Sequence, residues 1–338
     1  MLAARAQANC LGRPVFEAGP GGVADVVRRT GGLQAQSWRG AAYAVRARST
    51  ATTWTDVAQA READRSVLRG WFMRGTLQLV ATDHAGPLLG ILGPQIIKDS
   101  ERRHGELGLT EDKRKRAAGL IESQLLANGP TGRAELGELL AKAGLIPEPT
   151  GQAVYALIRY TGLLGLLCYG PGHDRTETWV ATRDWLGRPL ELQRDGVGEL
   201  ARRYLAAYGP ATVHDFATWS GLPVPAARAA VKEVATTEFV VAGESLAAVA
   251  DLRGCPDLRL LGEFDPYLLG YRNRRHALDE THRKRIHPGG GMLKPAVVQA
   301  GRVIGSWRHD RREVELFEPG PEPAQLAGEL EDLRRFQD

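Results

Sequence analysis

The chain has 338 residues and a formal net charge of +4, and its hydrophobic content of 43% and charged content of 25% are those of a soluble globular protein with several modules. No apolar run approaches the ~20 residues of a membrane span, and the N-terminus lacks the apolar core of a signal peptide, so we expect a cytoplasmic protein without a membrane partner. The three cysteines, Cys10, Cys168 and Cys255, lie far apart in the sequence, which argues against a disulfide framework and against a zinc site.

The N-terminal region predicts a mixture of helices and one strand. Hydrophobic periodicity predicts helices at 2–10, 22–30, 53–64, 84–92 and 110–127. Alternating residues predict a strand at 75–81, and the run Gly19-Pro20-Gly21-Gly22 predicts a loop. We interpret this region as a divergent copy of a module that the chain contains twice more.

That module is visible as a repeated pattern at 119–136 and 199–216. Each copy is an amphipathic helix that ends in Gly-Pro, and the two prolines, Pro130 and Pro210, lie 80 residues apart. A short helix, a third helix (151–163 and 224–235) and an apolar run follow in both copies. Helix, turn, helix, helix and hairpin is the layout of a winged helix, a helix-turn-helix variant.

Beyond residue 237 the pattern changes to short apolar segments separated by Gly and Pro, which predicts β structure closed by a helix at 324–336. The expected fold class is therefore α+β, with tandem winged-helix domains and a C-terminal β-rich, barrel-like region. The expected domains are three winged helices and a C-terminal β region with a basic hairpin and the closing helix, at 1–105, 106–192, 193–245 and 246–338.

Basic residues are densest between 272 and 287, where six Arg or Lys and three His stand against two acids. Glycines 289–291 follow and let a backbone approach a ligand closely. Such a segment suits the DNA backbone or minor groove, although a solvated loop is the alternative. The candidate DNA-binding residues here are Arg272, Arg274, Arg275, His282, Arg283, Lys284, Arg285 and His287. We read a second basic run, 113–116, as a solvated helix face.

The run Leu33-Gln34-Ala35-Gln36-Ser37-Trp38 carries two glutamines spaced by two. On an extended segment their side chains point to the same side. An amide cannot act as a general base, so the pair suits holding a water or the polar edge of a ligand. The alternative is a turn with exposed amides. We add Trp38 and Arg39, which follow directly, to the candidate DNA contacts.

Two acidic residues are candidates for a general base, but each has a simpler interpretation. Asp83 is expected to cap a helix, and Asp265, which precedes a proline, is expected to be a turn residue. Their roles stay open, as does the role of Gln78. The sequence contains no nucleophile elbow, Walker loop, His-Glu-x-x-His motif or dinucleotide fingerprint.

Several landmarks occur together in one order along the chain, and in that order they resemble the AlkZ/YcaQ-like winged-helix DNA glycosylases. They are the Gln motif, then 74–80, 264–271, 288–291 and 301–308. The resemblance implies that Gln34 and Gln36 are the catalytic pair, and that a DNA-binding β-hairpin lies near the basic segment. A sister group has Asp at the second position, so Gln36 places this chain nearer the AlkZ type.

The resemblance implies a cofactor-free, metal-free and monomeric DNA glycosylase, associated with the nucleoid. It would hydrolyse the N-glycosidic bond of cationic N7- or N3-alkylpurines in double-stranded DNA, including bulky natural-product adducts and interstrand crosslinks, in repair or genotoxin self-resistance. A positively charged base is a good leaving group, so two amides that orient water are chemically sufficient. Two alternatives are a non-enzymatic winged-helix transcriptional regulator and a protein that sequesters a genotoxin. A regulator would not need the Gln pair.

Overall fold

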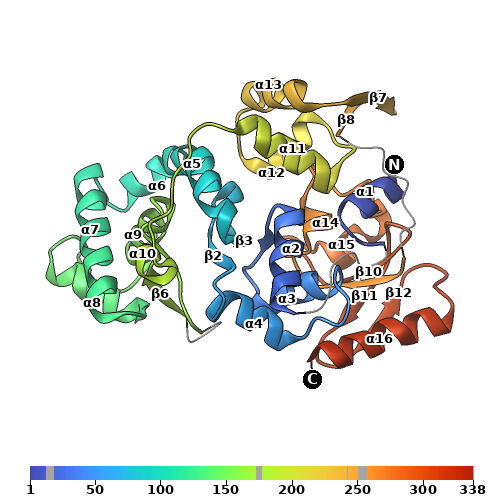
Figure 1. Ribbon diagram of the computed structural model, residues 1–338, viewed down its shortest axis with the longest axis horizontal. Helices are drawn as coiled ribbons and strands as arrows, with labels where there is room; N and C mark the ends of the chain where they lie inside the picture. The colour runs from blue at the N-terminus through green and yellow to red at the C-terminus, as the bar shows by residue number, and fades with distance from the viewer. Residues whose placement is uncertain (13–18, 173–176, 242, 250–256, 338) are drawn as a thin grey trace. The chain divides into compact units, whose positions relative to one another are not determined.

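The computed structural model describes residues 1–12, 19–172, 177–241, 243–249 and 257–337. The chain divides into two compact units (Figure 1). The first unit comprises Met1–Val67, Leu79–Ala81 and Val197–Asp338, and the second comprises Leu68–Gln78 and Thr82–Gly196. Cys10 and Cys168 are buried free thiols, and Cys255 lies outside the described residues.

The described residues of the N-terminal part form four helices and three short strands. These are α1 (Leu2–Ala8), α2 (Pro20–Thr30), β1 (Leu33–Gln34), α3 (Trp38–Arg46), α4 (Trp54–Glu62), β2 (Val67–Trp71) and β3 (Leu77–Ala81), with a 3-10 turn at Met73–Gly75. The strands pair in the order β1-β3-β2. Helix α2 starts at Pro20, where sequence predicted a loop, because proline is favoured in the first turn of a helix.

Helix α3 is an element that the sequence did not predict. It begins where Ser37 accepts a hydrogen bond from the backbone N–H of Gly40 at 3.0 Å, an N-cap that satisfies one of the open donors of the first turn. Of its nine residues, all except Arg39 are buried. Arg46 is one of the buried residues, so its charge must be paired inside the protein.

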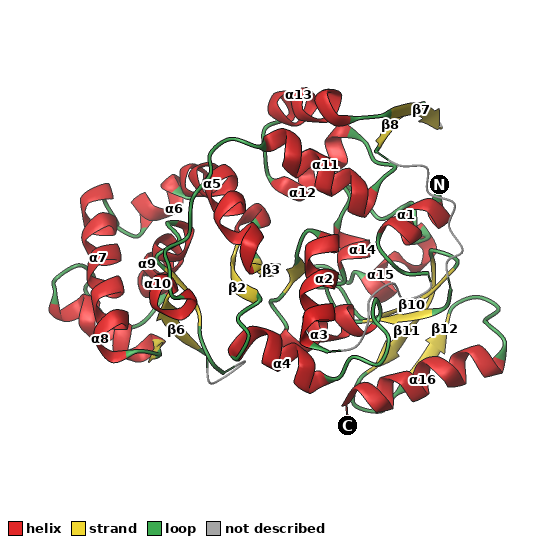
Figure 2. Ribbon diagram, in the orientation of Figure 1, coloured by secondary structure: helices red, strands yellow, loops and turns green. Residues whose placement is uncertain are grey.

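The second unit is built mainly from helices (Figure 2). Its elements are α5 (Thr82–Asp99), α6 (Glu101–Glu106), α7 (Glu111–Asn128), β4 (Thr131–Gly132), α8 (Arg133–Lys142), α9 (Gln152–Leu163), β5 (Leu167–Tyr169), β6 (Thr178–Ala181) and α10 (Thr182–Leu186). The antiparallel strands pair in the order β4-β6-β5. No helix among the described residues has the length and hydropathy of a membrane span.

The 80-residue repeat of the sequence is present as a repeated series of elements. After α7, α8, α9 and the β5–β6 hairpin, the chain forms α11 (Val197–Tyr208), α12 (Val213–Ser220), α13 (Val224–Val234), β7 (Thr237–Val241) and β8 (Glu244–Ala248). The N-terminal series α2, β1, α3, α4, β2, β3 has the same order of elements as α7, β4, α8, α9, β5, β6, and its strands pair in the same way.

The C-terminal part is a four-stranded antiparallel sheet with helical segments. It contains β9 (Arg259–Leu261), α14 (Pro266–Leu269), a 3-10 turn (Glu280–His282), α15 (Arg283–Ile286), β10 (Ala296–Gln299), β11 (Arg302–Arg308), β12 (Glu313–Leu316) and α16 (Pro323–Gln337). The order β12-β11-β10-β9 leaves β12 and β9 as edges, so the described residues form an open sheet and not the expected barrel. The basic segment folds into short helical turns instead of a hairpin, and strand-like pairing is confined to a bridge between Gly289 and Met292.

Helices α2, α3, α4 and α16 share one hydrophobic core with the C-terminal sheet. Tyr43 of α3 packs with Trp307 of β11 and Phe336 of α16, with ring centroids 5.4 and 5.9 Å apart. The N-terminal helices and the C-terminal sheet of the first unit therefore fold as one body, although they are the two ends of the chain.

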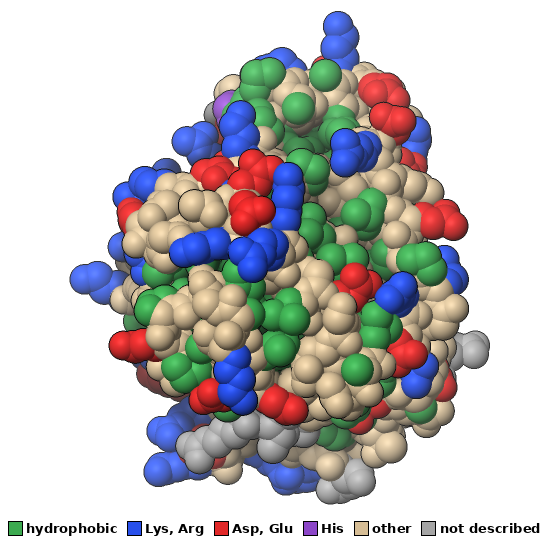
Figure 3. Space-filling view, turned by 90° about the vertical axis from the view of Figure 1, so that its left-hand side faces the viewer, with side chains coloured by type: hydrophobic (Ala, Val, Ile, Leu, Met, Phe, Trp, Pro, Cys, Tyr) green, Lys and Arg blue, Asp and Glu red, His purple; other side chains and the backbone are tan. Residues whose placement is uncertain are grey.

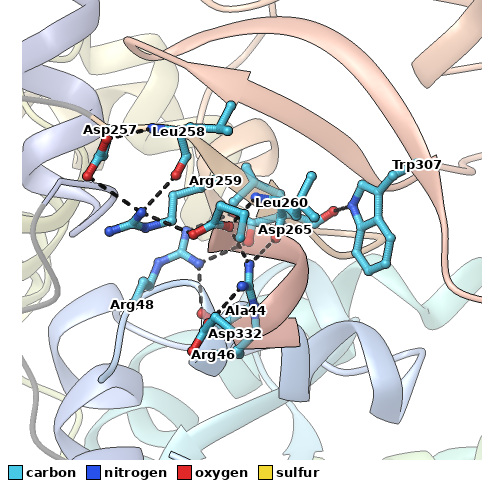
Figure 4. A network of polar contacts seen from close by, with 12 residues as sticks. Ala44, Arg46, Arg48, Asp257, Leu258, Arg259, Leu260, Asp265, Trp307 and Asp332 are labelled. Carbon is cyan, nitrogen blue, oxygen red and sulfur yellow. Dashed lines mark hydrogen bonds and ion pairs between the residues drawn. The ribbon is translucent and has the colours of Figure 1, made fainter. Parts of the chain in front are cut away.

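Buried arginines tie α3 to the C-terminal part through a polar network (Figure 4). Arg46 donates to Glu329 and Asp332 of α16 at 3.0 and 2.9 Å. Arg48, two residues beyond the end of α3, donates to both carboxylate oxygens of Asp265 at 2.8 and 2.9 Å, and both side chains are fully buried. Asp265 also accepts from the Tyr267 N–H at 2.9 Å and caps α14, as expected of a turn residue, and it is in addition the counter-charge of a buried guanidinium.

Replacing Asp265 with Asn should lower the free energy of unfolding by about 3 to 5 kcal/mol, because the Arg48 charge would stay buried without its counter-charge. The matched control is Asp310→Asn, which neutralises an exposed carboxylate 3.2 Å from Arg308 and should leave the denaturation midpoint unchanged. Urea denaturation followed by circular dichroism measures both variants. A wild-type midpoint for Asp265→Asn would contradict the structural role of this pair.

Candidate active site

The two glutamines of the motif lie together at the end of β1. Gln34 is 8% exposed and Gln36 is exposed, and Gln34 Nε2 donates a hydrogen bond to Gln36 Oε1 at 2.5 Å. Ala35 between them is buried in the core. The predicted same-side arrangement is therefore confirmed. One amide is held by the protein, and it in turn orients a second amide that reaches solvent.

A carboxylate that the sequence analysis did not select stands beside the motif. Ser37, the residue after Gln36, donates a hydrogen bond to Glu263 Oε1 at 2.5 Å, and the other oxygen of Glu263 binds His309 Nε2. Burial raises the pKa of the Glu263 carboxyl, but the hydrogen bonds from His309 and Ser37 outweigh burial and hold the pKa below its ordinary value. Glu263 is therefore ionised at neutral pH. Its only sequence signal is its position next to the landmark that starts at Phe264.

The basic segment is anchored by apolar residues and presents its charges around a pocket. Ala277, Leu278 and Ile286 are buried, so the segment is an ordered part of the unit. A pocket of about 340 Å³ is lined by Arg272, Asn273, Arg274, Arg275, Leu278, Glu280, Arg283 and His287. Burial lowers the pKa of Arg274, and burial with the charges of Arg274 and Arg283 lowers the pKa of His287. The shift of His287 reflects the positive charges beside it.

The cations of this segment fall into two groups. Arg283 pairs with Glu280 at 2.6 Å, Arg285 pairs with Glu315, and His282 lies 3.6 Å from Glu318. In a second group, no carboxylate lies within 4.0 Å of the charged side-chain nitrogens among the residues that the structure describes: Arg272, Arg274, Arg275 and Lys284. Arg272 contacts an acid through its backbone N–H, which donates to Asp215 at 2.9 Å. This second group has the charges that an external anion would neutralise.

The two candidates that follow the Gln motif differ in their surroundings. Trp38 is 2% exposed and packs in the core, with the guanidinium of Arg61 4.3 Å from the centre of its ring. The expectation that Trp38 contacts DNA is therefore wrong, because its surface is already covered. Arg39, the next residue, is exposed.

The remaining polar candidates of the sequence lie in the second unit. Gln78 is 3% exposed and donates to Thr76 at 2.8 Å, and Asp83 lies in the first turn of α5. In the run 113–116, Lys115 pairs with Glu111 at 2.5 Å and Arg116 lies 3.9 Å from Asp112. On the face shown in Figure 3, basic and acidic side chains stand among one another. Among the described residues, no group of three His, Cys, Asp or Glu side chains is placed to hold a metal ion.

Comparison with known proteins gives a consistent result. Residues 27–336 match the model of a family described as DNA glycosylase AlkZ-like. The chain is 31% identical over 330 residues to an interstrand DNA cross-link repair glycosylase of Streptomyces sahachiroi. This match covers 89% of the present chain and 86% of that protein. The solved structure of the Streptomyces sahachiroi DNA glycosylase AlkZ is similar with a TM-score of 0.78 at 26% identity, over 99% of this chain and 95% of that one.

The family model spans the Gln motif, the basic segment and the closing helix, and the solved structure matches the mixed α and β fold over almost all of the chain. Sequence and fold thus agree over both units. The chain belongs to the family of AlkZ-like DNA glycosylases.

Proposed function

We propose that the protein excises cationic N7- and N3-alkylpurines from double-stranded DNA, and that Gln34 and Gln36 form its catalytic pair. The observation that carries the proposal is the amide–amide hydrogen bond of 2.5 Å between a buried and an exposed glutamine. A loop with two solvated amides would not order them in this way. The pair presents one oriented polar group to a ligand at a point where the chain reaches solvent.

The chemistry requires little more than positioning. Alkylation at N7 or N3 makes the purine positively charged, so the base leaves with the electron pair of the N-glycosidic bond and becomes neutral. No protein group has to protonate it. Water then bonds to C1′ and loses a proton to solvent. An amide oxygen can accept from that water and an amide N–H can fix its orientation, so the pair lowers the cost of bringing water to an oxocarbenium-like state.

We propose that the three repeated series of elements are winged helices that divide the chain at 1–105, 106–192 and 193–245, followed by the C-terminal region 246–338. Winged helices bind the DNA backbone and grooves. In the C-terminal region, the Arg272, Arg274 and Arg275 side chains supply positive charge without acidic partners. We propose that they bind backbone phosphates, together with Lys284 and Arg39.

The relative from Streptomyces sahachiroi is named for interstrand crosslink repair. We extend this to the present chain as a proposal: bulky N7-linked adducts and crosslinks are substrates, because they carry the same positive charge on the purine. Ala35, in the middle of the motif, is buried in the core.

Replacing Gln34 or Gln36 with Ala should cut excision of N7-methylguanine from duplex DNA and leave DNA affinity nearly unchanged. Loss of one orienting amide should cost about 2 to 4 kcal/mol of transition-state stabilisation, as for an oxyanion-hole donor. Single-turnover incubation followed by alkaline cleavage at abasic sites measures the rate. The matched control is Gln95→Ala, which removes an amide of α5 that donates to Asp99 away from the motif. Wild-type rates in both motif variants would remove the catalytic assignment.

Replacing Arg272, Arg274 and Arg275 together with Gln should weaken binding to any duplex. It should also reduce the slope of log Kd against log salt by about 2 to 3, since each lost phosphate contact contributes about 0.9. The control is the double variant Arg283→Gln/Arg285→Gln. These two guanidiniums already pair with Glu280 and Glu315, so their loss should change the slope by about 1 or less. Fluorescence anisotropy over a salt series tests both. An unaltered slope in the triple variant would move the DNA contact to another surface.

A further inference from the structure

The contacts around Ser37 form a brace between α3 and the segment that follows β9. The Ser37 hydroxyl accepts from the Gly40 N–H at 3.0 Å and donates to Glu263 at 2.5 Å. Both hydrogen-bonding functions of this hydroxyl are thus used within the protein. Since consecutive Cα atoms lie only about 3.8 Å apart, a fixed Ser37 also fixes the backbone of Gln36.

The backbones on either side of this brace touch. A Cβ atom added to Gly40 would stand 2.5 Å from the carbonyl oxygen of Glu263, and one added to Gly262 would stand 3.0 Å from Tyr43 Cβ and 3.1 Å from the Gly40 oxygen. Two glycines therefore face each other across the contact. This close approach brings the Glu263 carboxylate within reach of Ser37.

His309 holds the other end of the carboxylate. Its ring stacks on Tyr43 of α3, with centroids 4.9 Å apart and planes 9° apart, and it meets Trp307 edge-on at 4.6 Å. Trp307 in turn donates to the Leu261 carbonyl at 2.8 Å. The imidazole cannot rotate without breaking these packings, so Glu263 is fixed between a rigid histidine and the cap of α3.

We propose that Glu263 is a positioning residue for excision: clamped by His309, its carboxylate holds the Ser37 hydroxyl and thereby sets where the Gln36 amide points. This rests on the proposed role of the Gln pair. The chemical reason is geometric. A neutral amide contributes only when it lies in the correct place relative to the reacting water, and a displacement of about 1 Å can cost about 100-fold in rate.

The test is single-turnover excision of N7-methylguanine at saturating enzyme, with DNA affinity and thermal midpoint measured for each variant. Glu263→Ala should slow excision by about 10- to 100-fold while DNA affinity stays within about twofold. Glu263→Gln keeps an oxygen that accepts from Ser37 and should stay within about threefold of wild type. Ser37→Ala breaks the brace from its other end and should match Glu263→Ala. Glu331→Ala, which removes an exposed carboxylate of α16, is the control.

Combination with Gln36→Ala separates positioning from a general effect on folding. If Glu263 acts through Gln36, then Glu263→Ala should add little loss in the Gln36→Ala background. Three results would each overturn the proposal. The rate losses of Glu263→Ala and Gln36→Ala could multiply in the double variant, Glu263→Gln could be as slow as Glu263→Ala, or Glu263→Ala could keep the wild-type rate. If the wild-type protein itself released no N7-methylguanine, the proposed substrate would fail instead, and these comparisons would be repeated on a crosslinked duplex.

Discussion

The rest of the first unit depends on the ion pairs that two buried arginines, Arg46 and Arg48, make with carboxylates, because these pairs hold α3 in place. Arg46 reaches carboxylates 283 and 286 positions further along the chain, and Arg48 reaches one 217 positions further. Burying a guanidinium is costly, and the cost is offset only when the carboxylate is also present and the geometry is good. The network therefore has one satisfied arrangement, in which α3 lies against both α16 and the segment after β9.

That placement determines the geometry of the candidate site. Gln34 ends β1 and Ser37 caps α3, so the motif is a tight link between two anchored elements. Glu263 and Asp265 are two residues apart and contact opposite ends of α3: Glu263 binds the cap, and Asp265 binds Arg48 beyond the last turn. Asp265, in the landmark that begins at Phe264, thus holds the C-terminal end of α3 through Arg48.

Sequence reasoning predicted the elements that have one polar and one buried face. Helices α7, α9, α13 and α16 lie close to the predicted ranges, and the β structure predicted beyond residue 237 is present as β7 to β12. The amides of Gln34 and Gln36 meet as expected. Sequence reasoning failed where contacts between distant parts of the chain determine the structure. Helix α3 is buried on nearly every side, and Arg61 covers the ring of Trp38. Asp265 forms a buried ion pair with Arg48, which is distant in the sequence. In the basic segment, a few apolar residues between many charges fold it into helical turns.

In the proposed mechanism, a charged leaving base needs only the positioning that two amides provide. The most direct measurement compares single-turnover excision of N7-methylguanine with excision of 7-methyl-7-deazaguanine, which has the same shape but no positive charge, in the same duplex. We expect similar binding of both duplexes, release of the charged base, and no detectable release of the neutral analogue. Release of both bases at comparable rates would contradict it, because a neutral purine would require an acid that the Gln pair cannot supply.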